Sequence, residues 1–306
     1  MKATLLYNAT VVTAEKEAVG SVLVIGDTIE EVIFSDREDY GFRVDRIMKQ
    51  HGELEVVDLE GKWLMAGGID AHVHFREPGL IHKADMETES FAAAAGGVTY
   101  VMDMPNTNPT TTTAQALKEK LDLAKGRTAG KIAFHIGATN SNAENIVRLL
   151  QEGDASTGIG PDDIAGVKVF MGSSTGNMLV DDNSTLARLF AISVKPILVH
   201  CEDEQTIKAN LEKAVEKYGE EIPFREHENI RSRSACIKSS IRALEMAIKH
   251  GTKLVLCHIS QRKRWRWCVL PNSAIRPSLL RPHATICGSA TRITTGSAAR
   301  SSATRQ

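Results

Sequence analysis

The sequence contains few cysteines, no long apolar run and, in its last part, no acidic residue. Its five cysteines are odd in number and never spaced as Cys-x-x-Cys, which argues against a disulfide framework and fits a reducing compartment. No apolar run reaches 18 residues, which argues against a membrane-spanning helix, and no signal-peptide core follows Met1. We therefore expect a cytoplasmic protein without a membrane partner.

The overall composition is that of an ordinary globular protein. Of 306 residues, 42% are hydrophobic and 25% are charged, and the net charge is −1. These values exclude a disordered chain, a coiled coil and a collagen-like repeat. A chain of this length is predicted to form about two domains.

The near-zero charge hides a strong asymmetry at residue 261. Residues 261–306 carry nine basic residues and no Asp or Glu, whereas residues 1–260 carry 28 basic and 38 acidic residues. Ser, Thr, Ala and Arg make up 25 of the last 46 residues, with neither strand alternation nor a helical apolar stripe. We expect 261–306 to be a basic tail that is disordered or non-native. Its first residues, Gln-Arg-Lys-Arg-Trp-Arg-Trp, could contact phosphates and bases, but their abrupt onset argues against nucleic acid as a partner.

The first 65 residues predict part of a small β-sandwich domain. They are rich in Val, Ile and Thr, and two tight turns, Gly26-Asp27 and Glu60-Gly61, separate neighbouring runs. The runs expected as strands are Ala3–Ala14, Ser21–Ile25, Thr28–Ile33, Glu53–Leu59 and Lys62–Met65.

Residues 66–260 alternate short apolar strands with helical stretches. The expected strands are Ile69–Phe75, Val98–Met104, Lys131–Ala138, Ala165–Met171, Pro196–Cys201 and Lys253–Ile259. The expected helices include Thr113–Lys125, Ala143–Gln151, Glu204–Tyr218 and Ser234–His250. Near-continuous apolar strands are typical of a parallel sheet that is buried on both faces. The fold class predicted is α/β, an incomplete (β/α)8 TIM-type barrel of about six βα units.

Four histidines and one lysine stand near the carboxyl ends of these predicted strands. His72 and His74 are two residues apart, so a strand turns both imidazoles to the same side. His200 and His258 each end an apolar run, and Lys168 lies within one. Because the carboxyl ends of barrel strands form the active-site mouth, and neutral imidazole is a favoured zinc ligand, this repetition predicts a metal centre.

Simpler interpretations apply to Lys168 and to several other candidates. The alternative interpretation of Lys168 is one partner of a salt bridge to a nearby carboxylate, since a buried lysine needs compensation. Cys201 and Cys257 adjoin two of the histidines, and we expect strand alternation to turn both thiols away from a metal and into the core. His135, in the third predicted strand, is interpreted as a hydrogen-bonded core histidine.

Residues 1–260 resemble the dihydroorotases of the amidohydrolase superfamily. The resemblance is carried by Gly-Ile-Asp-Ala-His-Val-His-Phe-Arg-Glu-Pro-Gly at 68–79, Ala-Ala-Gly-Gly-Val-Thr at 94–99, Asp-Met-Pro-Asn-Thr at 103–107 and Val-Asp-Leu-Glu-Gly-Lys at 57–62. Met65-Ala66-Gly67 stands where that family commonly has Leu-Pro-Gly.

The resemblance implies a zinc hydrolase that opens a cyclic amide. His72 and His74 would bind the first zinc ion, His200 and His258 the second, and a carboxylated Lys168 would bridge them. Metal-bound hydroxide would attack dihydroorotate to give carbamoyl aspartate, a reversible step of pyrimidine synthesis. The implied partner is this small-molecule substrate, and a homodimer stays an open expectation.

Arg76 and Asn106 are the residues that the resemblance assigns to the substrate carboxylate. A guanidinium offers a planar fork that fits a carboxylate. Allantoinases resemble this segment but usually carry Asn in place of Arg76, and hydantoinases lack the Met-Pro-Asn-Thr segment at 104–107. Dihydroorotase is therefore the best match, with allantoinase as the alternative among the cyclic amidohydrolases.

The family's acid/base aspartate, which lies in an Asp-x-Ala-Pro-His segment of the last barrel strand, is missing. No Asp or Glu follows Glu245. We therefore expect a chain with this sequence to have little or no dihydroorotase activity. A shifted reading frame after codon 260 would explain both this loss and the basic tail, and an alternative is a non-catalytic relative that serves as a binding or scaffold protein.

Overall fold

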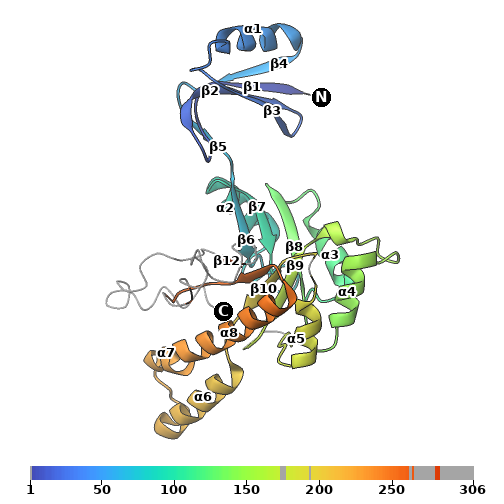
Figure 1. Ribbon diagram of the computed structural model, residues 1–306, viewed down its shortest axis with the longest axis vertical. Coiled ribbons are helices and arrows are strands. Elements are labelled where there is room, and N and C mark those ends of the chain that lie inside the picture. Colours follow the sequence, from blue (N-terminus) through green and yellow to red (C-terminus); the bar gives the residue numbers. More distant parts are fainter. Residues whose placement is uncertain (1, 173–176, 193, 262–263, 265–279, 283–306) are drawn as a thin grey trace. The chain divides into compact units, whose positions relative to one another are not determined.

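The computed structural model describes residues 2–172, 177–192, 194–261, 264 and 280–282. The chain divides into two compact units, Met1–Gly68 and Ile69–Gln306. Each unit has its own sheet and its own buried apolar cluster, and they are described separately (Figure 1).

The first unit is built on one mixed five-stranded sheet. Its strands are β1 (Ala3–Val12), β2 (Glu17–Ile25), β3 (Thr28–Phe34), β4 (Leu54–Asp58) and β5 (Trp63–Met65). Strand β1 pairs antiparallel with β2, and β2 pairs antiparallel with β3. The other edge of β1 pairs in parallel with β4 near its start and with β5 near its end. All five expected strands are present, and they form a single sheet.

Helix α1 (Tyr40–Gln50) interrupts this β structure, and the sequence analysis did not predict it. Val44 and Ile47 are three residues apart, so they lie on one face of the helix, and both are buried. They pack in one cluster with Leu5 and Leu23 of the sheet. The helix is held by this short apolar stripe, which the predominance of β-forming residues around it concealed.

The second unit is a curled sheet of consecutive strands. They are β6 (Gly68–Val73), β7 (Val98–Asp103), β8 (Lys131–Gly137), β9 (Ile164–Phe170), β10 (Ile197–His200), β11 (Leu254–Leu256) and β12 (Leu280–Pro282). They neighbour one another in chain order, and the registers from β7 to β12 are parallel. The expectation of an incomplete (β/α)8 barrel is confirmed: β6 to β11 supply six strands, and within the described residues helices follow the first five of them.

Helices follow the strands along the chain. They are α2 (Met86–Ala95), α3 (Ala114–Ala124), α4 (Ala143–Glu152), α5 (Asn183–Phe190), α6 (Glu204–Tyr218), α7 (His227–Ile230) and α8 (Arg233–His250), with short 3-10 turns at Pro161–Asp163 and Phe224–Glu226. Five of them, α2, α3, α5, α6 and α8, begin at an Asp, Thr or Ser whose side chain accepts a backbone N–H of the first turn. None of the helices that the structure describes is long and apolar enough to cross a membrane.

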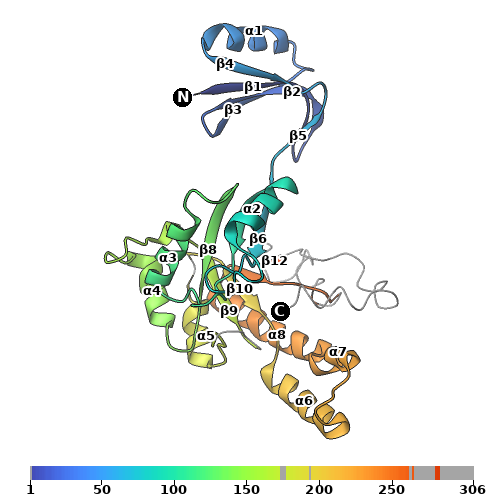
Figure 2. The same ribbon diagram turned by 180° about the vertical axis from the view of Figure 1, so that it is seen from behind.

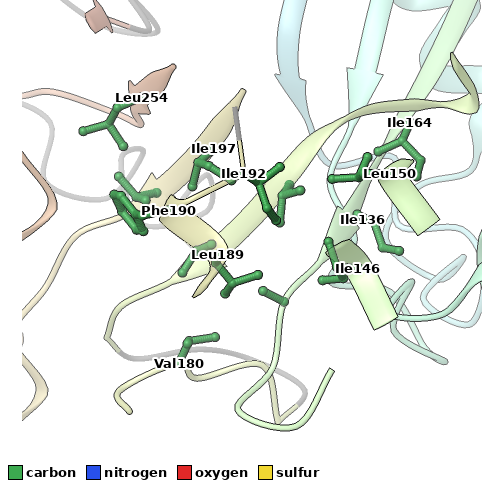
Figure 3. Close-up of a cluster of buried hydrophobic side chains, with 14 of the residues drawn as sticks. Ile136, Ile146, Leu150, Ile164, Val180, Leu189, Phe190, Ile192, Ile197 and Leu254 are labelled. Carbon is green, nitrogen blue, oxygen red and sulfur yellow. The ribbon is translucent and has the colours of Figure 1, made fainter. Parts of the chain in front are cut away.

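The core of this unit lies between the sheet and the helices on its outer side. Helices α3, α4 and α5 lie along the same side of strands β8 to β10 in both views (Figures 1 and 2). Side chains from α4, including Ile146 and Leu150, lie near Ile136 of β8 and Ile164 of β9 (Figure 3). Burial of this apolar layer fixes which side chains of each strand face outward, and therefore which face inward.

Most of the basic tail lies outside the described residues. Leu280–Pro282 form β12, which pairs in parallel with β11. The residue pattern of the tail predicts no strand there. Backbone hydrogen bonds to the open edge of β11 account for this short strand, because main-chain pairing does not require an alternating side-chain pattern.

Candidate active site

The residues predicted to form a site come together at the carboxyl ends of the strands. His72 lies in β6 and His74 directly after it, Lys168 lies in β9, His200 is the last residue of β10 and His258 follows β11 by two residues. Neighbouring parallel strands bring these positions to one edge of the half-barrel.

The four imidazoles form a continuous row. The ring centroids are 5.2 Å apart for His72 and His74, 5.8 Å for His72 and His258, and 4.8 Å for His200 and His258. Nδ1 of His200 lies 3.0 Å from Nε2 of His258, within hydrogen-bond distance. Histidines at the ends of β6, β10 and β11 therefore contact one another, although these strands are far apart in the sequence.

Lys168 is buried beside this row and has no acidic partner among the described residues. Its side chain is 1% exposed. Nζ donates to Sγ of Cys257 at 3.3 Å and lies 5.0 Å from the ring centroid of Phe170. A salt bridge, the simpler interpretation of this lysine, is not formed within the described part of the chain, so its charge lacks the usual compensation.

Cys257 is buried in a small apolar cluster, as predicted, but its thiol accepts from Lys168, so the expectation that it turns away from the site was wrong. Leu254 and Leu256 pack in the outer core cluster, so alternation places residue 257 on the inner face. His258 reaches the same region because its backbone leaves the extended conformation, with a φ of 38°. The strand ends at Leu256, and the backbone turn after it determines where His258 lies.

Cys201 and His135 lie where packing was predicted. Cys201 is 1% exposed and belongs to the outer core cluster. His135 is 1% exposed, and its Nε2 lies 3.1 Å from the backbone oxygen of Ala71 across the sheet. Both residues therefore serve the core of the half-barrel.

Arg76 and Asn106 stand on two loops that touch each other. The pKa of His74 is lowered by the Arg76 charge and raised by a hydrogen bond with Asn106, so both groups lie close to that imidazole. The loops meet at Gly79, where φ is +79° and a Cβ would lie 1.8 Å from the backbone oxygen of Asn108. Only glycine permits this approach.

Beneath these loops lies a buried ion pair that the sequence analysis missed. Asp103 Oδ2 and Lys120 Nζ are 2.6 Å apart, and both side chains are fully buried. Asp103 Oδ1 accepts the backbone N–H of Phe75 at 2.8 Å, and Lys120 donates to the backbone oxygen of Met104 at 2.9 Å. The pair thus ties α3 to the ends of β6 and β7, from which the two loops depart.

Glu202 is a second residue that the prediction missed. Its Oε2 lies 2.6 Å from Nε2 of His200, and Arg231 Nε donates to its Oε1 at 3.0 Å. Burial raises the pKa of Glu202, but the hydrogen bonds with His200 and Arg231 outweigh it and hold that pKa at about 2. The spacing His200-Cys201-Glu202 repeats the two-residue spacing of His72 and His74, and this signal could have identified it.

Burial lowers the pKa of three imidazoles of this region, those of His74, His135 and His200. Removal from water is the largest cause that lowers the pKa of His74 to about 3, and the charges of Arg76 and Lys168 add to it. Desolvation likewise lowers the pKa of His135 to about 4 and outweighs Glu202 in lowering that of His200. Neutral imidazole is the form that binds metal ions.

The donor set fits a metal ion in its chemistry, although no three His, Cys, Asp or Glu side chains of the described residues surround a common point as ligands do. Two nitrogen ligands of a tetrahedral zinc ion are separated by about 3.3 Å, given Zn–N distances of 2.0–2.1 Å. The separation of 3.0 Å between the nitrogens of His200 and His258 is close to that value. Small rotations of the His200 and His258 rings would lengthen this distance to the value expected for two ligands of one zinc ion.

The stability of the metal-free protein should fall with acid below pH 6.5, in part through His135. Unfolded, this residue takes up a proton near pH 6.5, whereas folded it does so near pH 4. The unfolded state therefore binds more protons in this interval, and the free energy of unfolding rises with pH across it. We expect the pKa difference of His135 to lower the free energy of unfolding by about 3 kcal/mol between pH 6.5 and pH 4. Urea unfolding at a series of pH values measures this change.

The matched variant for this prediction is His135→Asn. Its free energy of unfolding should depend less on pH between 6.5 and 4 than that of the wild type. Equal slopes for the two proteins would contradict the assignment to His135.

Comparison with known proteins identifies the family. The description of the amidohydrolase family matches residues 63–300, a range that contains every predicted site residue and continues into the basic tail. The chain belongs to the amidohydrolase family. A half-barrel with histidines at its strand ends is consistent with this membership.

Several dihydroorotases are similar in sequence to this amidohydrolase. The dihydroorotase of Methanosarcina mazei is 32% identical over 212 residues, which are 67% of this chain and 42% of the relative. That of Methanosarcina acetivorans is 33% identical over 208 residues, and that of Streptococcus thermophilus is 44% identical over 100 residues. The chain thus spans less than half the length of these curated relatives.

Solved hydantoinase structures share the fold. The L-hydantoinase of Arthrobacter aurescens has a TM-score of 0.73 at 23% identity, with 88% of this chain and 55% of that chain covered. A D-hydantoinase from Thermus sp. has a TM-score of 0.70 at 19% identity, with 91% and 57% covered. At these identities the likeness shows the fold alone, and this amidohydrolase corresponds to little more than half of each hydantoinase chain.

Proposed function

We propose that the chain carries the site of a dihydroorotase, an enzyme that reversibly hydrolyses (S)-dihydroorotate to N-carbamoyl-L-aspartate in pyrimidine synthesis. The observation that carries this proposal is the row of four histidines beside a buried lysine without an acidic partner among the described residues. The dihydroorotases among its relatives support the choice of substrate.

The proposal includes two zinc ions. His72 and His74 would hold the first, His200 and His258 the second, and Lys168, carboxylated by CO₂, would lie between them. Zinc, when bound, lowers the pKa of a water molecule towards neutrality and polarises the carbonyl that is attacked. The burial of Lys168 supports this role, since carboxylation converts an uncompensated cation into an anionic ligand.

Arg76 and Asn106 would orient the substrate through its carboxylate. Arg76 is half-buried and influences His74 electrostatically, so an anion bound to it would lie beside the histidine row. The guanidinium can donate two parallel hydrogen bonds to a carboxylate. Asn106 hydrogen-bonds with His74, a proposed ligand of the first zinc ion, and this contact supports a role for its amide close to the bound substrate.

Proton transfer to the departing ring nitrogen is the part of the reaction that the sequence does not provide. The acid/base aspartate of the family lies in the last barrel strand, and no Asp or Glu follows Glu245 here. We therefore propose that the literal chain binds metal and substrate but turns over slowly, which also suits a non-catalytic binding role.

Replacing Arg76 should weaken the binding of N-carbamoyl-L-aspartate to the zinc-loaded protein. Hydrogen bonds to charged groups contribute about 1.5–3 kcal/mol, so Arg76→Asn should raise the Kd about 10- to 100-fold. Isothermal titration calorimetry measures this effect directly without requiring turnover.

Two comparisons make the titration specific. Arg148→Asn alters an exposed arginine of α4 and should leave the Kd unchanged. Hydantoin, a cyclic amide without a carboxylate, should bind the wild type and Arg76→Asn alike. An unchanged Kd for carbamoyl aspartate in Arg76→Asn would refute the proposed substrate position.

A further inference from the structure

We infer that Glu202, held by Arg231, is a positioning residue that fixes the imidazole of His200 with its proton on Nε2 and its lone pair on Nδ1. This inference rests on the proposed function, because the lone pair on Nδ1 would serve to bind a metal ion. The residue is not a ligand in this assignment and acts only through His200.

The tautomer follows from the contacts of the carboxylate. An ionised carboxylate only accepts hydrogen bonds, so the nitrogen that lies 2.6 Å from Glu202 Oε2 must donate. That nitrogen is Nε2 of His200. In the neutral ring the other nitrogen then carries no proton, and it is Nδ1 that faces Nε2 of His258 at 3.0 Å.

Arg231 keeps the carboxylate ionised and in place. Its guanidinium contacts both oxygens of Glu202, with Nε at 3.0 Å from Oε1 and Nη2 against Oε2. Glu202 is 7% exposed, so water competes little for these bonds. A bidentate arginine also sets the plane of a carboxylate, and that plane aims Oε2 at the histidine.

The backbone of Glu202 is fixed as well. A Cβ at Gly172 would lie 2.0 Å from the Glu202 backbone oxygen, so the segment after β9 packs tightly against it. The next residue, Asp203, caps α6 by accepting the backbone N–H of Thr206 at 2.9 Å. Glu202 is thus anchored between β10 and α6, and its side chain has little freedom to leave His200.

An ion pair that served only stability would not need the histidine. Arg231 alone would compensate the charge of Glu202, yet His200 shares Oε2 with it. A histidine that binds metal characteristically donates its other N–H to a carboxylate or carbonyl, which fixes the ring and raises its basicity. Since two cationic or donor groups hold Glu202 ionised, it does not replace the missing proton donor.

The experiment compares the wild type with Glu202→Gln in the full chain. The tautomer of His200 is read from ¹⁵N chemical shifts of the metal-free protein labelled at histidine, with the signal assigned by its loss in His200→Asn. Zinc affinity is measured by competition with a chelator. Glu216→Gln, which changes an exposed carboxylate of α6, is the matched control, and thermal unfolding confirms that each variant is folded.

The wild type and Glu216→Gln should show the Nε2–H tautomer of His200. Glu202→Gln should show a mixture of tautomers and bind zinc about 10- to 100-fold more weakly, the range for residues that orient metal ligands. An Nδ1–H tautomer in the wild type would overturn the inference. So would an unchanged tautomer and zinc affinity in Glu202→Gln, or no zinc binding by the wild type.

Failure of the proposed function would look different. If the wild type shows the expected tautomer and zinc affinity but never binds carbamoyl aspartate, the substrate assignment fails, while the role of Glu202 is supported.

Discussion

The purified, zinc-loaded chain should hydrolyse dihydroorotate about 10²- to 10⁴-fold more slowly than the dihydroorotase of Methanosarcina mazei. This range is the usual contribution of a positioned general acid or base, and no Asp or Glu follows Glu245 to provide one. Glu202 does not compensate, because its hydrogen bonds with His200 and Arg231 hold its pKa at about 2. Turnover is measured by the loss of dihydroorotate with time at saturating substrate.

Binding and turnover must be measured on the same preparation. A chain that binds carbamoyl aspartate yet turns over slowly fits the proposal. A rate equal to that of the full-length relative would contradict it and would require a proton donor that the described residues do not identify.

Asp103→Asn should destabilise the protein by about 3–5 kcal/mol, the usual cost of breaking a buried ion pair. The substitution leaves the charge of Lys120 in a fully buried position with no carboxylate. It also weakens the contact that holds the backbone N–H of Phe75, next to His74. Urea unfolding at neutral pH measures the change in the free energy of unfolding.

An exposed pair on the same helix provides the control. Lys118 and Asp122 are 2.6 Å apart and one helical turn from each other, with side chains that are 41% and 62% exposed. Asp122→Asn should therefore cost only about 0.5 kcal/mol or less. Equal changes in the free energy of unfolding for Asp103→Asn and Asp122→Asn would contradict the claim that burial makes the Asp103–Lys120 pair the more important one for stability.

The strand positions of the half-barrel could be predicted because burial on both faces leaves an unmistakable apolar run. The run ending in Val199 and His200 is an example, since the sequence places the histidine at the strand end and the structure agrees. Helix α1 was missed because its apolar stripe is only Val44 and Ile47, too short to stand out among β-forming neighbours.

The side on which a residue lies could be predicted only while the chain stayed extended. His72 and His74 follow simple alternation, and their rings are in contact. Cys257 and His258 do not, because β11 ends at Leu256 and the backbone then turns through a positive φ. Local periodicity carries no information about such a turn.

Ion pairs between residues far apart in the sequence could not be predicted from it. Lys120 is spaced as an ordinary helix residue, and nothing local indicates that it is buried against Asp103. Arg231 likewise reaches Glu202 across 29 positions. These pairings depend on how segments distant in the sequence pack together, which single-sequence patterns do not specify.

The zinc content of the full chain tests the central claim most directly. Mass spectrometry of metal in purified wild type, Lys168→Met and the surface control Lys208→Met gives zinc ions per chain. The account predicts two for the wild type and for Lys208→Met, and fewer than one for Lys168→Met, because Met fills the buried position without supplying an anionic ligand. A wild type without zinc, or a Lys168→Met variant that retains two, would contradict it.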